Sequence, residues 1–300
     1  MDAESRKIAI RQSLLEVQDI LVTTMKVLAV EQMGREPQIS NPSFGRYFYP
    51  NQQELGRVMD IYRSVLAIIG APLSTRQYEK CYEGNVAKLW LFNGDPPQNI
   101  RPVTPTTTTC RNSPMLFAST GGYIERNIPP TPDKLYGYIV FCDLWFATYR
   151  PMTGPIALDI NLNPPGRSIE TCGRDWVQEA TGSSSQILLH ELIHDQAAYF
   201  KFRPNKDRIG DVNIQRPPPD NAVEVAYGSF RSMHMKDWPQ PNPNLDPNQP
   251  PPPKKQPIDN ADNYVYTALE IYYKYKYNLP DWIDPPDPKY APPCPPLRHP

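Results

Sequence analysis

The chain has 300 residues, of which 39% are hydrophobic and 11% aromatic, and its 31 basic and 32 acidic residues give a net charge of −1. This composition can supply one or two hydrophobic cores and excludes a fully disordered chain. No segment approaches the roughly 20 apolar residues that a membrane-spanning helix needs, and no basic excess or stripe indicates nucleic-acid binding. We therefore expect a folded protein whose partners include neither a membrane nor a nucleic acid.

Apolar periodicity predicts two helices in the N-terminal part of the chain. In residues 4–32, apolar side chains recur at three- and four-residue spacing and form one stripe. A second helix, over 51–69, is predicted to begin at Asn51, whose side chain can cap it, with the acid of a capping box at Glu54. Residues 1–72 are therefore expected to form a helical N-terminal part of the fold.

Short apolar runs replace the helical pattern between residues 73 and 150. Clusters of Gly, Pro, Asn and Thr separate these runs, which is typical of short strands joined by long turns. The predicted strands are Leu89–Phe92, Met115–Phe117 and Tyr138–Phe141. Helical patterns return at 181–200, 221–233 and 259–277. The sequence thus predicts an α+β fold, mainly α, with a small antiparallel sheet and a helical N-terminal half.

Two proline-rich segments account for much of the unusual content of 38 prolines. Residues 239–257 and 279–300 can form neither a helix nor a central strand, because proline lacks an N–H donor and fixes φ. We expect polyproline II or extended loops there. The segment 239–257 is interpreted as an insertion and 279–300 as a tail. A proline-reading partner for 239–257 is one hypothesis, and a stiff surface loop is the other.

An HExxH sequence runs from His190 to His194, inside the predicted helix 181–200. Residues i and i+4 share one face of an α-helix, so the two imidazoles can reach one metal ion. Glu191 lies about 100° around the helix and can approach a water molecule on that metal without ligating it. The pattern predicts a Zn²⁺ site with Glu191 as the catalytic base.

A catalytic zinc site needs a third protein ligand, which spacing alone does not identify. Of the remaining histidines, His299 lies in the proline-rich tail and His234 at the far end of a predicted helix. The candidate carboxylates are Asp195, Asp207, Asp211, Asp220 and Glu224. Asp195 points about 100° away from its neighbour His194 and is better placed outside the ligand set. The others remain open at this point.

Beyond the HExxH motif, residues 221–228 resemble a pattern of the aspzincin metallopeptidases, the group that contains fungal deuterolysin and the lysine-specific metalloendopeptidases. In that family HExxH is followed by Gly-Thr-x-Asp-x-x-Tyr-Gly, whose Asp is the third zinc ligand. Tyr227 and Gly228 match in register, and Glu224 stands where the family has Asp. Other family segments are similar to residues 44–48, 139–146 and 260–266.

The resemblance implies a zincin-type fold and a zinc-dependent endopeptidase that acts on proteins or peptides, with residues 73–278 as its core. The implied zinc ligands are His190, His194 and Glu224. Tyr227 would donate a hydrogen bond to the oxyanion that develops during hydrolysis. Asp220, just outside the register, is an alternative third ligand.

The resemblance also bears on specificity. Asp262 matches a residue that lines the pocket for the basic side chain in the lysine-specific branch, which implies some preference for basic residues near the cleaved bond. Val265 replaces the second carboxylate of that pocket. The other interpretation of Asp262 is a helix N-terminal cap.

The five cysteines fit the secreted habit of the family, with Cys142 or Cys172 pairing with Cys110 or Cys81. The N-terminal segment carries no pattern of a secretory signal, so a mature secreted form and a cytosolic protein are both compatible with it.

A different class of function is a zincin-fold binding or effector protein whose metal site is weakly active or inactive. Glu224 in place of Asp and the proline insertion motivate this alternative.

Overall fold

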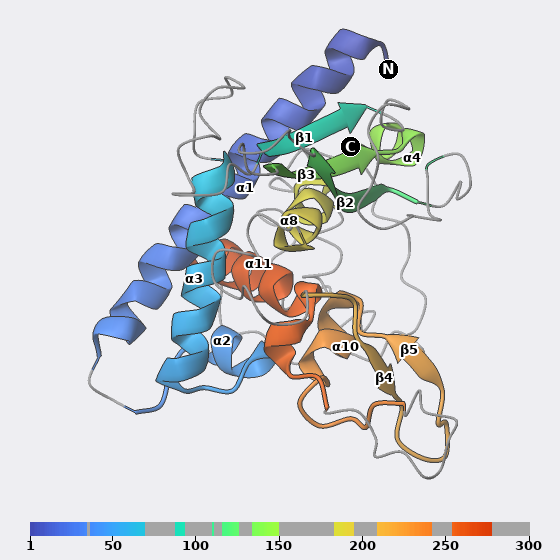
Figure 1. Cartoon of the computed structure of the whole chain (residues 1–300). Helices are drawn as coiled ribbons and strands as arrows, with labels where there is room; N and C mark the ends of the chain where they lie inside the picture. The colour runs from blue at the N-terminus through green and yellow to red at the C-terminus, as the bar shows by residue number, and fades with distance from the viewer. Residues whose placement is uncertain are drawn as a thin grey trace, which may run out of the picture. The chain divides into compact units, whose positions relative to one another are not determined.

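The computed structural model describes residues 1–34, 37–69, 88–93, 110, 116–125, 134–149, 183–194, 209–241 and 254–277. In these ranges the helices are α1 (Ala3–Met33), α2 (Pro42–Tyr47), α3 (Gln52–Ile69), α4 (Asp143–Ala147), α8 (Ser184–His194), α10 (Gly228–Met233), the 3-10 helix η2 (Pro257–Asp259) and α11 (Ala261–Tyr277). The strands are β1 (Lys88–Asn93), β2 (Ala118–Glu125), β3 (Lys134–Phe141), β4 (Asn213–Gln215) and β5 (Val223–Val225) (Figure 1). The α+β class is therefore confirmed.

The chain divides into two units, and the division falls inside both α1 and α3. Unit 1 comprises Met1–Val22, Met59–Ala157 and Gly182–Arg208, and unit 2 comprises Thr23–Val58, Leu158–Thr181 and Ile209–Pro300. The predicted boundaries at residues 72 and 278 lie outside the described residues, as does the proline-rich tail. Of the insertion 239–257, only 239–241 and 254–257 are described.

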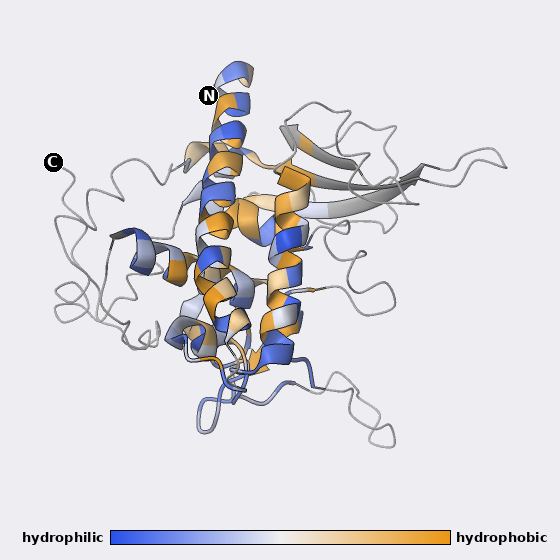
Figure 2. Ribbon diagram, turned by 90° about the vertical axis from the view of Figure 1, so that its left-hand side faces the viewer, coloured by the Kyte–Doolittle hydropathy of each residue, from blue (hydrophilic) through white to orange (hydrophobic). Residues whose placement is uncertain are grey.

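The two long N-terminal helices are confirmed as α1 and α3. The apolar stripe of α1 is buried, with Val17, Leu21 and Leu28 fully inaccessible to solvent. Figure 2 shows the matching alternation of hydrophobic and hydrophilic residues around α1, which begins at the labelled N-terminus. Burial of one face in this way is what holds an amphipathic helix in place, since isolated helices are marginal in water.

The N-terminus of α3 forms half of the predicted capping box. The Asn51 side chain accepts the backbone N–H of Glu54 at 2.9 Å, as expected. The Glu54 carboxylate, however, accepts the backbone N–H of Tyr49 at 3.1 Å, two residues before Asn51. Burial raises the pKa of the Glu54 carboxyl. The acid of the box is therefore used to fix the chain that leads into the helix.

The short helix α2 is not predicted by the sequence pattern, which treats Pro42 only as the end of the preceding helix. Pro42 in fact occupies the first turn of α2, where its missing N–H costs nothing. Asn41 caps the helix, because its side chain accepts the backbone N–H of Phe44 at 3.0 Å.

Unit 1 contains a sheet in the order β1–β3–β2. β2 pairs antiparallel with β3, but β1 pairs parallel with β3, so the antiparallel prediction is wrong for one of the two pairings. β1 and β3 contain two of the predicted strands, whereas Phe117 of the third one precedes β2. A disulfide joins Cys110 to Cys142, which follows β3 directly, and this is one of the pairings that the sequence left open.

Unit 2 is built around α11, whose residues from Ala261 to Tyr273 are all buried. α11 packs against α2 and α10. The predicted helix 259–277 is thus confirmed, but the predicted helix 221–233 is wrong. Its first part is β5, which pairs antiparallel with β4, and only its second part is the helix α10. Two β-branched valines favour the strand, and Gly228, with a φ of 82°, starts α10 in a new direction.

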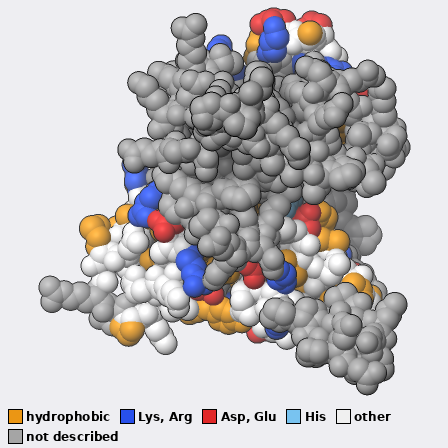
Figure 3. Space-filling model, in the orientation of Figure 1, with side chains coloured by type: hydrophobic (Ala, Val, Ile, Leu, Met, Phe, Trp, Pro, Cys, Tyr) orange, Lys and Arg blue, Asp and Glu red, His pale blue; other side chains and the backbone are white. Residues whose placement is uncertain are grey.

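Among the helices that the structure describes, none combines the length and the apolar character that crossing a bilayer requires. On the face shown in Figure 3, acidic and basic side chains of the described residues lie close to one another. This mixture fits the nearly equal numbers of acidic and basic residues in the chain.

Candidate metal centre

The helix α8 carries the HExxH motif in unit 1 and is fixed on several sides. The Ser183 hydroxyl accepts the backbone N–H of Gln186 and so caps the start of the helix. Trp145 of α4 donates its indole N–H to the carbonyl of Ser184 at 3.3 Å, and Ser185 donates to the buried carboxylate of Glu16 in α1. The apolar residues Leu188, Leu189, Leu192 and Ile193 are fully buried. The motif therefore lies on a helix whose position is set by packing.

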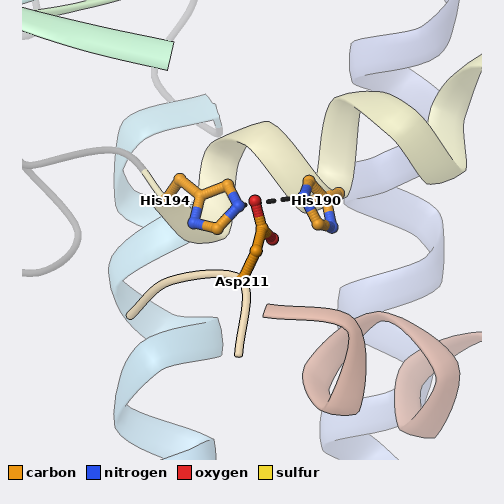
Figure 4. A group of neighbouring side chains, drawn as sticks. All are labelled: His190, His194 and Asp211. Atoms are coloured by element: carbon orange, nitrogen blue, oxygen red, sulfur yellow. Dashed lines mark hydrogen bonds between the residues drawn. The ribbon is translucent and has the colours of Figure 1, made fainter. Parts of the chain in front are cut away.

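The two histidines lie on one face of α8, as their spacing predicts (Figure 4). Their Nε2 atoms are 2.9 Å apart. A tetrahedral zinc ion with two zinc–nitrogen bonds of about 2.0–2.1 Å would hold two such atoms about 3.3 Å apart. His194 is buried, with 7% of its surface exposed, and His190 is half-buried. The pair thus fits one metal ion after a shift of a few tenths of an ångström.

Glu191 is buried beside β2, against which α8 packs. The hydroxyl of Thr120, a residue of β2, contacts both the Glu191 backbone carbonyl, at 3.0 Å, and the carboxylate atom Oε2. One oxygen of the carboxylate is therefore held by the sheet.

Asp211 and Tyr227, both in unit 2, contact each other. The Tyr227 hydroxyl donates a hydrogen bond of 2.8 Å to Oδ2 of Asp211. Both side chains are exposed, Tyr227 by 45%. Tyr227 precedes α10 and does not lie on a helix with Glu224, so the predicted helical spacing between the two residues is not formed.

His190, His194 and Asp211 each offer one ligand atom, and these three atoms lie within 4.8 Å of one another (Figure 4). Two imidazole nitrogens and a carboxylate oxygen are donors that Zn²⁺ accepts in catalytic sites. Of the carboxylates that the sequence offered as third ligand, Asp211 is the one in this group. Asp195 and Asp207 lie outside the described residues.

Glu224 and Asp220 contact a buried arginine and are not part of the metal-ligand group. Oε2 of Glu224 accepts Arg231 Nε at 2.6 Å and lies 3.1 Å from Arg216 Nε. Asp220 lies 3.5 Å from the same Arg216 nitrogen. The hydrogen bond from Arg231 is the main cause that holds the pKa of the Glu224 carboxyl below its usual range. The structure thus gives Glu224 two cationic partners in place of a metal.

Asp262 lies in the first turn of α11 and is 6% exposed. Its Oδ2 accepts the backbone N–H of Gly228, the first residue of α10, at 2.8 Å. This is a capping-type contact between two helices, in which Asp262 serves the start of α10 rather than that of its own helix. Its role in a substrate pocket stays a prediction.

No protein-family model matches the chain. No curated protein matches it either. Among solved structures, a zinc peptidase from Grifola frondosa matches with a TM-score of 0.38 and 12% sequence identity, over 90% of this chain and 97% of that chain. A likeness at this level establishes neither the family of the chain nor its fold.

Proposed function

We propose that this chain is a zinc-dependent endopeptidase in which His190, His194 and Asp211 bind the metal and Glu191 is the general base. The observation that carries the proposal is the HExxH motif on a packed helix together with a carboxylate whose oxygen lies within 4.8 Å of both imidazole nitrogens. Two histidines and one carboxylate leave a tetrahedral zinc ion one open position, as hydrolysis requires.

Zinc in such a site supplies Lewis acidity, which makes a water molecule acidic enough to lose its proton near neutral pH. Glu191 lies between the two histidines in the sequence and does not belong to the ligand group. Thr120 occupies its Oε2, so Oε1 is the atom that would accept the proton. The hydroxyl of Thr120 would keep the carboxylate oriented during this transfer.

Two substitutions separate metal binding from chemistry. Glu191→Gln is expected to bind one zinc ion per chain and to lose cleavage of an unfolded protein substrate, because the amide cannot accept the proton. Asp211→Asn is expected to lose zinc affinity as well, because a neutral amide is a poor zinc ligand. Asp60→Asn, which changes an exposed aspartate paired with Arg63, serves as the control. Full activity of zinc-loaded Glu191→Gln would refute the proposal.

A second candidate is a metal-binding protein that does not hydrolyse peptides. The contact between Thr120 and the Glu191 carboxylate favours it, because one of the two carboxylate oxygens is then engaged by the protein itself. The same assay decides between the two candidates: a natural chain that binds zinc and cleaves nothing supports the second, and a partner of segment 239–257 would then be sought.

The disulfide between Cys110 and Cys142 supports an oxidising compartment, and we propose a secreted protein on this basis. Proteins or peptides are the proposed substrates. The preference for basic residues remains a prediction based on Asp262, whose carboxylate is already engaged by the Gly228 backbone N–H. A library of peptides that differ only at the residues flanking the cleaved bond would measure it.

A further inference from the structure

We infer that Tyr227 is a positioning residue, whose hydroxyl orients the Asp211 carboxylate toward the metal, and that the β4–β5 hairpin brings these two residues together. The inference rests on the proposed function, since it concerns the third ligand of that metal site. It assigns Tyr227 a role that differs from donation to an oxyanion.

The register of the hairpin places the two residues opposite each other. Asn213 pairs with Val225, and one step outward the Ala226 N–H donates to the Val212 carbonyl at 2.8 Å. Continuing this antiparallel ladder by one more residue on each side pairs Asp211 with Tyr227. Directly opposed side chains on an antiparallel pair are close enough to interact, and here they form the 2.8 Å hydrogen bond.

The open end of this hairpin is fixed by the residues at and just before the start of α11. Asn260, which is fully buried, accepts the Val212 N–H through its side chain and donates to the Ala226 carbonyl. Gly210 donates its N–H to Asp259 and accepts that of Ala261. The residues on both sides of Asp211 are therefore fixed through main-chain bonds.

The exposed side chain of Asp211 is not fixed by these backbone contacts, because rotation about its own bonds leaves them unchanged. The Tyr227 hydroxyl selects one orientation, since it donates to Oδ2. Hydrogen bonds from outside the ligand set that orient a metal ligand in this way commonly contribute about 10- to 100-fold to metal affinity.

Zinc affinity of the full chain, measured by competition with a chromophoric chelator, tests this inference. Tyr227→Phe is expected to bind zinc about 10- to 100-fold more weakly than the natural chain. Tyr264→Phe is the matched control, because it removes a buried hydroxyl that donates to the Ile258 carbonyl at 2.9 Å, in the same unit. That variant is expected to lose stability but to keep its zinc affinity.

The outcomes are distinct. If Tyr227→Phe binds zinc as tightly as the natural chain while kcat falls, Tyr227 acts on the reaction and not on Asp211, and the inference is overturned while the proposed function stands. If both tyrosine variants lose zinc affinity equally, the effect is one of general stability, and the inference is again overturned. If the natural chain binds no zinc, the proposed function itself fails, and the inference falls with it.

Discussion

Replacing Glu224 by glutamine tests the ion cluster that this residue forms with two arginines. The carboxylate has two arginine partners, Arg231 at 2.6 Å and Arg216 at 3.1 Å. The Arg216 side chain is only 4% exposed and stacks near the Trp238 ring, 5.5 Å from its centroid. Glutamine keeps the shape and one acceptor oxygen, but it removes the nearer of the two negative charges beside this buried cation, the other being Asp220.

The expected loss is about 1–2 kcal/mol of unfolding free energy at pH 7, because hydrogen bonds to charged groups contribute about 1.5–3 kcal/mol and the introduced amide would retain part of that. Partial exposure of the pair lowers the value further. The arginines hold the folded-state pKa of Glu224 below its ordinary value of 4.5. The carboxylate therefore stabilises the fold above pH 4.5, and this contribution is lost as the pH falls through the lowered pKa.

Urea denaturation of the two proteins between about pH 3 and pH 7 measures this difference. The gap between the natural chain and Glu224→Gln should be widest near neutrality and should close in acid, while zinc affinity stays close to that of the natural chain. Glu4→Gln, which breaks an exposed pair with Lys7 on α1, is the control and should change little. A loss of zinc affinity in Glu224→Gln with unchanged stability would refute the reasoning and would restore Glu224 as a ligand.

Two further predictions concern buried contacts away from the metal. Burial raises the pKa of Glu270, despite its ion pair with Arg46, so the folded chain holds this proton more tightly than the unfolded chain does. The stability of the natural chain relative to Glu270→Gln should therefore fall as the pH rises above about 4.5, the ordinary value, in chemical denaturation. The opposite slope would show that Arg46 outweighs burial. The Cys110–Cys142 disulfide closes a separation of 32 residues, for which loop-closure entropy gives about 3–4 kcal/mol. Cys142→Ser should lose about that much unfolding free energy, and an unchanged value would mean that the bond does not form in solution.

The long helices and the geometry of the HExxH motif can be predicted from the sequence, because each depends on residues that are close to one another in the chain. α1, α3 and α11 are long enough for an apolar stripe to identify them, and the HExxH spacing fixes its own geometry once a helix forms. The parallel pairing of β1 with β3 is not local. It joins strands with β2 between them in the chain, and no pattern within either strand records its partner.

The segment after Ile209 shows how a hairpin can be mistaken for the first part of a helix. Residues 213–225 contain two short β-branched or alternating runs around consecutive prolines and an Asp-Asn turn, and this is a hairpin signal. The prediction of a helix over 221–233 overrides that signal, while Glu224 is predicted as a ligand from its place in the family pattern.

In an antiparallel hairpin, the residues at the two open ends lie side by side whatever the length of the chain between them. The residue that meets Tyr227 is Asp211, sixteen positions earlier. The family pattern that the sequence resembles has an Asp three residues before its Tyr-Gly. In this chain the hairpin places Asp211 beside Tyr227, and Glu224, at the spacing of the family pattern, contacts Arg216 of that hairpin segment. The pairing of Asp211 with Tyr227 therefore follows from the register of the strands, and not from the count of residues between them.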